Sequence, residues 1–279
     1  MVSGESGLTV GEIMKVAVIG AKGFVGSAFS RLLRGKEEYE LFEITRDNYE
    51  ECKGYYDVVV YAASNSRKYI ADENPLEDFE KSVLNRMKAV LDYKAGLQIH
   101  ISSVDVYEDL DDPEKTTEEH HIDVFRNSNY GFHKYVEEQF VQHYSEEWLI
   151  FRLAGMVGPG LKKNPVYDIL NDRPIRIHPE SRYQYIDTDS VARIVWEIFE
   201  GGFVNEIYNV CGDGLISPLE IAKIAGKSIN LELVSVDMKP RIVDVCIEKI
   251  KRVCEVPMTY DVIKKFVLGR GENAEVSFQ

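Results

Sequence analysis

The sequence predicts an α/β protein: a doubly wound parallel sheet, followed by a smaller mixed α/β part towards the C-terminus. Largely apolar runs at 16–19 and 57–61 lack polar–apolar alternation, which suits strands covered on both faces. Between such runs lie stretches whose apolar residues recur at helical spacing. Strands that alternate with helices in this way indicate a parallel sheet with helices on both faces.

The first strand leads into a glycine-rich turn, Gly20-Ala-Lys-Gly23-Phe24-Val25-Gly26. Glycines let the backbone turn sharply and approach a pyrophosphate, and the following helix offers free N–H groups and the positive end of its dipole. An ordinary strand-to-helix turn is the alternative. The position of the turn at the first strand favours a Rossmann-like, dinucleotide-binding fold. The predicted cofactor contacts in this turn are Gly20, Gly23, Phe24, Val25 and Gly26.

Further elements follow in the order that such a sheet requires. Asn74-Pro75 has the form of an N-cap followed by a first-turn proline, so we expect it to open a helix. The other predicted elements are strands at 40–45, 98–101 and 148–153 and a helix at 130–144.

The pattern changes after residue 154. Gly158-Pro-Gly160 breaks the chain, and short strands at 175–177 and 207–210 then mix with a helix at 189–200, N-capped by Asp189. Ser217-Pro-Leu-Glu220 is a capping box that opens another helix. We expect 1–13 to be a flexible extension, 14–154 with 183–200 to bind NAD(P), and 155–182 with 201–279 to bind substrate.

Composition excludes several classes of function. The 279 residues carry a net charge of −14, which opposes binding to nucleic acid but allows a small phosphorylated ligand. The four cysteines and six histidines show no metal-binding spacing. The sequence contains no apolar run long enough to cross a bilayer and no signal-peptide core. We therefore expect a cytoplasmic protein with no bound metal and no membrane partner.

Tyr130 and Lys134 are the strongest candidates for acid–base chemistry. They lie four residues apart on a predicted helix and so share a face. A tyrosine has a pKa of about 10, and a nearby ammonium lowers it towards the range useful for proton transfer. Tyr49/Lys53 and Tyr260/Lys264 have the same spacing. The Tyr130 pair is favoured because its helix follows a strand that ends at Ser102-Ser103, where ligands of open α/β sheets bind.

In order along the chain, these motifs resemble those of an extended short-chain dehydrogenase/reductase, the NAD(P)-dependent epimerase/dehydratase family that acts mostly on nucleotide sugars. The matching segments are Gly20-x-x-Gly23-Phe24-x-Gly26, Asp57-Val-Val-Val-Tyr-Ala-Ala63, Asn85, Ile101-Ser-Ser-Val-Asp-Val-Tyr107, Tyr130-Gly-Phe-His-Lys134, Phe151-Arg-Leu-Ala-Gly155, Gly158-Pro-Gly160, Tyr208-Asn-Val210 and Ser217-Pro-Leu-Glu220.

The resemblance implies roles for particular residues. Tyr130 is the catalytic acid/base, Lys134 holds the cofactor ribose and tunes the tyrosine, and Ser103 orients the substrate oxygen. Arg182 is placed where family members often carry an arginine that grips the nucleotide diphosphate. The further residues that the resemblance assigns are Ala62 and Ala63 at the cofactor and Ser64 and Asp105 at the substrate.

The end of the second strand bears on the choice of cofactor. NAD-using sites place a carboxylate there, and NADP-using sites place an arginine. Here Arg46 favours NADP, while Glu43 and Asp47 keep NAD open. The Thr-Arg-Asp run resembles the NADP-using GDP-fucose synthase branch, so we expect NADP in preference to NAD.

Two departures from the family pattern narrow the reaction. Dehydratases carry an acidic pair after the hydroxyl residue, whereas this chain has Val104 and Asp105, which argues against dehydration. The loop at 64–73 carries Arg67 and Lys68 and matches no branch.

These observations predict an NAD(P)-dependent oxidoreductase that reduces a keto group of a nucleotide-sugar. The first alternative is an epimerase with transient hydride transfer, and the second is a non-catalytic NAD(P)-binding regulator. By analogy with the family, a homodimer is possible.

Overall fold

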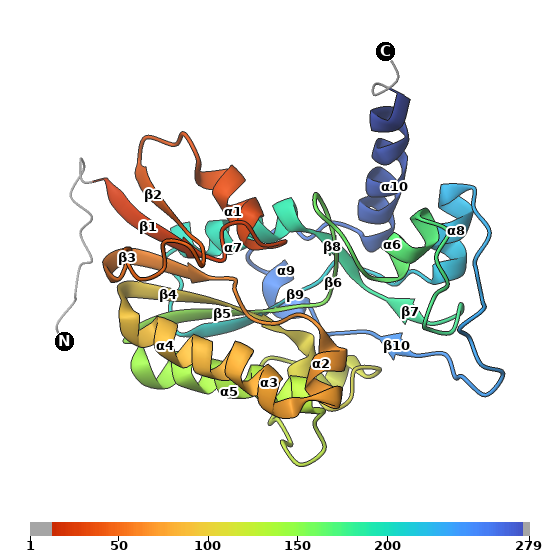
Figure 1. The fold of residues 1–279 in the computed structure, drawn as a ribbon, viewed down its shortest axis with the longest axis horizontal. Helices are drawn as coiled ribbons and strands as arrows, with labels where there is room; N and C mark the ends of the chain where they lie inside the picture. Colours follow the sequence, from red (N-terminus) through yellow and green to blue (C-terminus); the bar gives the residue numbers. More distant parts are fainter. Residues whose placement is uncertain (1–12, 276–279) are drawn as a thin grey trace.

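The computed structural model describes residues 13–275, so most of the predicted N-terminal extension lies outside the described residues. Its centre is a six-stranded parallel sheet in the order β2-β1-β3-β4-β5-β9 (Figure 1). This confirms the predicted fold class. The strands are β1 (Met14–Ile19), β2 (Tyr39–Ile44), β3 (Gly54–Tyr61), β4 (Tyr93–Ser103), β5 (Glu147–Leu153) and β9 (Glu206–Val210).

Helices cover both faces of this sheet. On one face lie α1 (Gly26–Leu33) and α7 (Thr188–Glu200), and on the other lie α4 (Asn85–Asp92) and α5 (Asn129–Tyr144) (Figure 1). Val18 packs in one core with Phe29 and Ile194, whereas its neighbour Ile19 packs in another with Ala89. Successive strand residues therefore both meet apolar layers, which explains the unbroken apolar runs.

The helical segment before β4 is assembled from short pieces. After α2 (Lys68–Glu73), α3 (Pro75–Phe79) runs into a π-helical turn, η1 (Glu80–Leu84), and then into α4. Asn74 caps α3 as predicted, because its side chain accepts a hydrogen bond from the Glu77 amide at 3.2 Å. The wide turn follows Asp78, which is fully buried; such turns are frequent near functional sites.

Three expectations for the C-terminal half differ from the structure. The N-cap of α7 is Asp187, whose carboxylate accepts from the Ser190 amide, so the prediction of Asp189 is wrong. Residues 175–177 form no strand, since only Pro174 bridges to Asn230. Strand β9 joins the main sheet through β5, although the expected boundary at residue 201 assigns it to the smaller part.

The smaller part has its own core. Val166, Ile221 and Ile263 meet there from α6 (Pro165–Leu170), α8 (Pro218–Ala225) and α10 (Thr259–Glu275). The predicted capping box of Ser217 and Glu220 is present at the start of α8. The remaining elements are η2 (Val104–Val106), η3 (Pro113–Lys115), β6 (Gly155–Val157), β7 (Arg182–Tyr183), β8 (Tyr185–Asp187), β10 (Ile242–Val243) and α9 (Glu248–Lys251).

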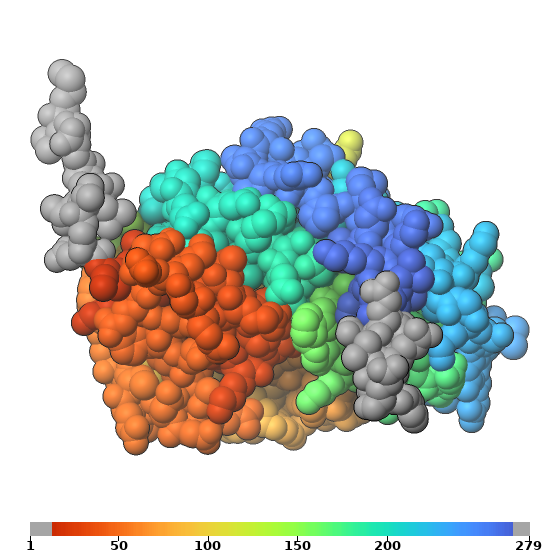
Figure 2. Space-filling model, turned by 90° about the horizontal axis from the view of Figure 1, so that it is seen from above, coloured from red at the N-terminus to blue at the C-terminus, as the bar shows by residue number. Residues whose placement is uncertain are grey.

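The two parts lie side by side. In Figure 2 the N-terminal strands and α1 (red to orange) occupy one end of the surface, and the C-terminal helices (blue) lie towards the other. Among residues 13–275, none of the helices has both the length and the apolar character that a bilayer span requires.

Candidate active site

The glycine turn between β1 and α1 is sterically restricted. A Cβ on Gly26 would lie 2.1 Å from the Gly20 carbonyl oxygen, and one on Gly20, where φ is +87°, would lie 2.8 Å from the Ala62 carbonyl oxygen. Val25, the N-cap of α1, makes no side-chain cap hydrogen bond. The turn therefore leaves the start of the helix without a side-chain cap and places glycines where a side chain would not fit, as a pyrophosphate site requires.

A pocket of about 570 Å³ lies beside this turn at the end of β2. Its charged residues are Lys22, Arg31, Arg34 and Glu43. Arg34 neutralises Glu43 through an ion pair of 2.7 Å, and Arg31 pairs with Asp189 on α7. The pocket therefore presents more cationic than anionic groups and fits a phosphorylated ligand.

Arg46, the residue predicted to favour NADP over NAD, lies next to this pocket. Arg46 is exposed, in a turn that Asn48 closes by accepting from the Thr45 amide and donating to the Glu43 carbonyl. Lys22, Arg31 and Arg34 line the pocket, and the sequence analysis missed them. The spacing of Arg31 and Arg34, three residues apart on the helix after the glycine turn, was the available signal.

The predicted acid–base residues meet at the carboxyl end of β4. Tyr130 and Lys134 lie near the start of α5, where Ser128 caps the helix by accepting from the Gly131 amide at 3.1 Å. Both side chains are buried, and Lys134 Nζ lies 5.8 Å from the centre of the Tyr130 ring.

A further glycine brings Ser103 to this pair. A Cβ on Gly131 would lie 2.0 Å from the Asp105 carbonyl oxygen, so α5 packs directly on the turn after β4. Ser103 donates to the Asp105 carboxylate at 2.8 Å, and its side chain also interacts with Tyr130. The structure thus brings together Tyr130, Lys134 and Ser103, which are distant in sequence.

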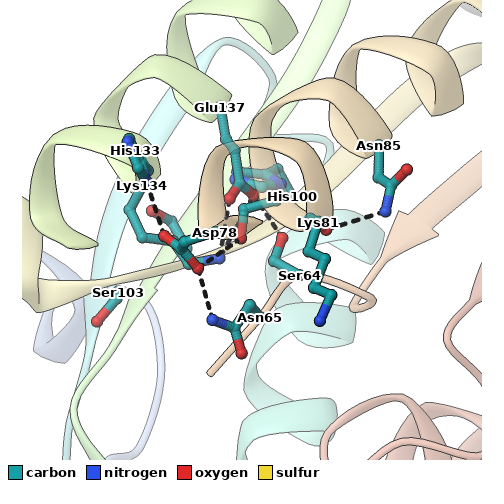
Figure 3. Close-up of polar contacts among 12 residues, drawn as sticks. Ser64, Asn65, Asp78, Lys81, Asn85, His100, Ser103, His133, Lys134 and Glu137 are labelled. Atoms are coloured by element: carbon teal, nitrogen blue, oxygen red, sulfur yellow. Dashed lines mark hydrogen bonds and ion pairs between the residues drawn. The ribbon is translucent and has the colours of Figure 1, made fainter. Parts of the chain in front are cut away.

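A buried carboxylate holds the lysine. Lys134 Nζ donates to both carboxylate oxygens of Glu137, at 3.2 and 3.4 Å, and Glu137 is fully buried (Figure 3). Ser64, predicted to contact substrate, instead donates to the same carboxylate. The ammonium charge of Lys134 is therefore already compensated before any ligand binds.

This arrangement reverses the predicted effect on Tyr130. Burial, followed by the negative charges of Asp105 and Glu137, raises the pKa of Tyr130 well above its ordinary value, and the Ser103 hydrogen bond opposes this only in part. The expectation of a lowered pKa is therefore not met in the ligand-free protein, where burial is the main cause of the rise and the charges of Asp105 and Glu137 add to it. The phenol is protonated and is therefore suited to giving a proton.

Two predicted substrate contacts have other partners. The Asp105 carboxylate forms an ion pair of 2.5 Å with Lys68 in addition to its bond with Ser103. Arg182 is exposed on β7 and donates to the Leu215 carbonyl at 3.4 Å. Within the described part of the chain, no contact joins Arg182 to Tyr130 or Ser103.

Comparison with protein-family models gives one match. The NAD dependent epimerase/dehydratase family model matches residues 53–211, more than half of the chain. The chain belongs to this family.

Solved structures of similar fold agree with this assignment. A variant of UDP-glucuronic acid 4-epimerase from Bacillus cereus, in complex with a fluorinated UDP-glucuronic acid and NAD, matches with a TM-score of 0.76 and 20% identity, over 93% of this chain and 100% of that chain. The dTDP-4-dehydrorhamnose reductase of Bacillus anthracis, in complex with NADP, matches with a TM-score of 0.75 and 18% identity, over 92% and 99%. At these identities the likeness concerns the fold. No curated protein matches the chain in sequence.

The epimerase/dehydratase site in this chain is supported by a second buried ion pair. Arg152 on β5 donates to both oxygens of Glu138 on α5, at 3.0 and 2.7 Å. Ser102, the neighbour of Ser103, donates to the same carboxylate at 2.5 Å, and Arg152 also donates to the Tyr107 hydroxyl at 2.8 Å. This network ties the ends of β4 and β5 to the helix that carries Tyr130.

Another buried group positions the loop after β3. Asp78 lies 2.7 Å from Nδ1 of His133 on α5 and accepts from the Asn65 side chain at 2.5 Å (Figure 3). Asn65 in turn accepts from the Arg67 amide at 3.0 Å. The loop is therefore fixed to α5, the helix that carries Tyr130, a link that the sequence analysis missed because its members are far apart in the chain.

Proposed function

We propose that the protein is an NADP-dependent reductase that acts on a keto group of a nucleotide-linked sugar. The observation that carries the proposal is the placement of the Tyr130 phenol, buried beside Ser103 and Lys134 at the carboxyl end of β4. A reduction leaves negative charge on the substrate oxygen, and a protonated phenol at that position can neutralise it. A reductase among the similar folds, a dTDP-4-dehydrorhamnose reductase in complex with NADP, is consistent with this class.

Each of these side chains has a separate role in the proposed reduction. In the free protein the Ser103 hydroxyl donates to the Asp105 carboxylate at 2.8 Å; on binding it can turn its single proton to the substrate oxygen, and Tyr130 then transfers its proton to that oxygen. Lys134 can hold the cofactor ribose while Glu137 keeps the ammonium in place. When bound in the glycine turn, the nicotinamide cofactor supplies the hydride.

An epimerase that uses transient hydride transfer begins with oxidation of its substrate. It must first remove a proton from a substrate hydroxyl, which requires a phenolate. Burial, followed by the charges of Asp105 and Glu137, disfavours that form of Tyr130 in the ligand-free protein, which favours a reaction that begins from the protonated phenol, as a reduction does.

The reaction class is tested by net consumption of cofactor. We expect NADPH absorbance at 340 nm to fall in proportion to product when the protein is given UDP-, dTDP- or GDP-linked 4-keto sugars. The matching 4-hydroxy sugars serve as the control and should give no net change. Interconversion of the 4-hydroxy sugars without net oxidation or reduction would instead establish an epimerase and contradict the proposal.

The preference for NADP rests on the pocket at the end of β2. Lys22, Arg31 and Arg34 line it, and its carboxylate, Glu43, is paired with Arg34. A 2′-phosphate bound there meets Lys22 and two guanidinium groups, whose present partners are Asp189 and Glu43, whereas the carboxylate that lines the pocket is already paired. Asp47, the other carboxylate that keeps NAD open, does not line the pocket.

We expect NADPH to raise the melting temperature more than NADH at equal concentration, because tighter binding to the folded state gives greater stabilisation. A Lys22→Gln variant should narrow that difference without changing the melting temperature of the free protein, since Lys22 is exposed. A larger effect of NADH on the wild-type protein would contradict the choice of NADP.

A further inference from the structure

Three cations meet beside the catalytic tyrosine. Arg67 and Lys68 follow β3, and Lys163 lies in the loop after β6. Lys163 donates from Nζ to the Ser66 carbonyl oxygen, so the two loops touch. Lys68 Nζ lies 5.8 Å from the centre of the Tyr130 ring. We call Arg67, Lys68 and Lys163 the cation cluster.

The charge of the cation cluster is only partly compensated. Asp105 pairs with Lys68, but within residues 13–275 no carboxylate pairs with Arg67 or Lys163. Lys163 is exposed overall, but desolvation, together with the charges of Arg67 and Lys68, lowers its pKa to about 8. Cations held close to one another repel. Here three cations gather locally although the chain as a whole has a net charge of −14. A bound anion would remove this cost.

The position of the cluster relates it to the substrate. Its loops leave the carboxyl ends of β3 and β6, and Ser103 ends β4; ligands of open α/β sheets bind at this edge. Asn65 holds the Arg67 amide and is itself anchored to buried Asp78. The backbone that carries Arg67 is therefore fixed in place before any ligand arrives.

We propose that Arg67, Lys68 and Lys163 bind an oxyanion of the substrate close to its reacting carbon. The oxyanion is either a carboxylate on the sugar or the sugar-proximal phosphate of the nucleotide diphosphate. A guanidinium binds either group through two parallel hydrogen bonds, and ammonium groups add point charges. This inference rests on the proposed function, since the reacting carbon is the one that Tyr130 serves.

The test measures binding without turnover. Glucose 1-phosphate, glucuronic acid 1-phosphate and uncharged glucose are titrated calorimetrically into wild-type protein and into Arg67→Gln and Lys163→Gln variants at low salt. Lys162→Gln is the matched control, because Lys162 is exposed, adjacent in sequence, and forms no side-chain hydrogen bond or ion pair within the described residues. Far-ultraviolet circular dichroism checks that each variant is folded.

We expect both cluster variants to weaken binding of an anionic probe by about ten-fold, while Lys162→Gln binds like the wild type. A loss confined to glucuronic acid 1-phosphate assigns the cluster to a sugar carboxylate, and an equal loss for both phosphates assigns it to the phosphate. Unchanged binding in the cluster variants overturns the inference, as does equal binding of glucose and the anionic probes. Because no cofactor or turnover is involved, failure of the reductase proposal would show only in the NADPH assay.

Discussion

Replacing Tyr130 by phenylalanine is expected to lower kcat by about 10²–10⁴-fold, the usual contribution of a positioned general acid. In the proposed reaction the phenol is the proton donor next to Ser103, and the substitution removes only its oxygen. The ring that packs beside Lys134 and Lys68 remains. NADPH binding, measured by fluorescence titration, should therefore stay within about two-fold of the wild type. A loss confined to kcat would mark an interaction that is made in the transition state.

Tyr260→Phe provides the matched control. Tyr260 and Lys264 have the same four-residue spacing, but they lie on α10 in the smaller part, and Tyr260 is exposed. This variant should reduce substrate at the wild-type rate. Full activity in Tyr130→Phe, or equal losses in both variants, would show that the proton follows another route.

A second large effect is expected from Arg152→Met. Arg152 is 2% exposed and donates to Glu138, which is itself fully buried. Removal of the guanidinium leaves Glu138 with a buried negative charge and only the Ser102 hydroxyl as a side-chain donor. We expect the free energy of unfolding to fall by about 3–5 kcal/mol, as is found when one partner of a buried ion pair is removed. Urea unfolding followed by circular dichroism measures this change.

Arg193→Met tests whether burial is the cause. Arg193 also binds a carboxylate twice, that of Glu197 at 2.9 Å, but the two side chains are 39% and 43% exposed. Arg193 also donates to the Glu255 carbonyl at 3.1 Å, so its loss should cost up to about 1.5 kcal/mol, the sum of an exposed helix pair and one exposed hydrogen bond. Equal urea midpoints for the Arg152 and Arg193 variants would contradict the role assigned to the buried pair.

Most of the sheet could be predicted from the sequence because the signals for it depend on nearby residues or on burial of whole strands. The apolar runs at β1 and β3 reflect helices on both faces, and Asn74 and Ser217 cap their helices through bonds three residues away. The prediction of the α7 N-cap was wrong because both Asp187 and Asp189 are residue types that suit that position. The end of β8, set by its pairing with β6 at Val157, decides between them.

The candidate site was only partly predictable for a related reason. The Tyr130–Lys134 spacing indicates a shared helix face, but it carries no information about Glu137, whose burial depends on the strands beneath α5. Glu137 and Glu138 are adjacent and chemically equivalent, yet one holds Lys134 and the other holds Arg152. Successive helix residues point about 100° apart, so only the tertiary arrangement separates their roles. The meeting of Lys163 with the loop after β3 likewise depends on packing between distant segments.

The central claim is that Tyr130 gives its proton to a substrate oxygen beside a nicotinamide held by the glycine turn. A crystal structure of the protein with NADPH tests this most directly. We expect the Tyr130 hydroxyl within about 6 Å of the nicotinamide ring, leaving room for a carbonyl in near-attack geometry. A nicotinamide bound elsewhere, with the phenol well beyond that distance, would contradict the account.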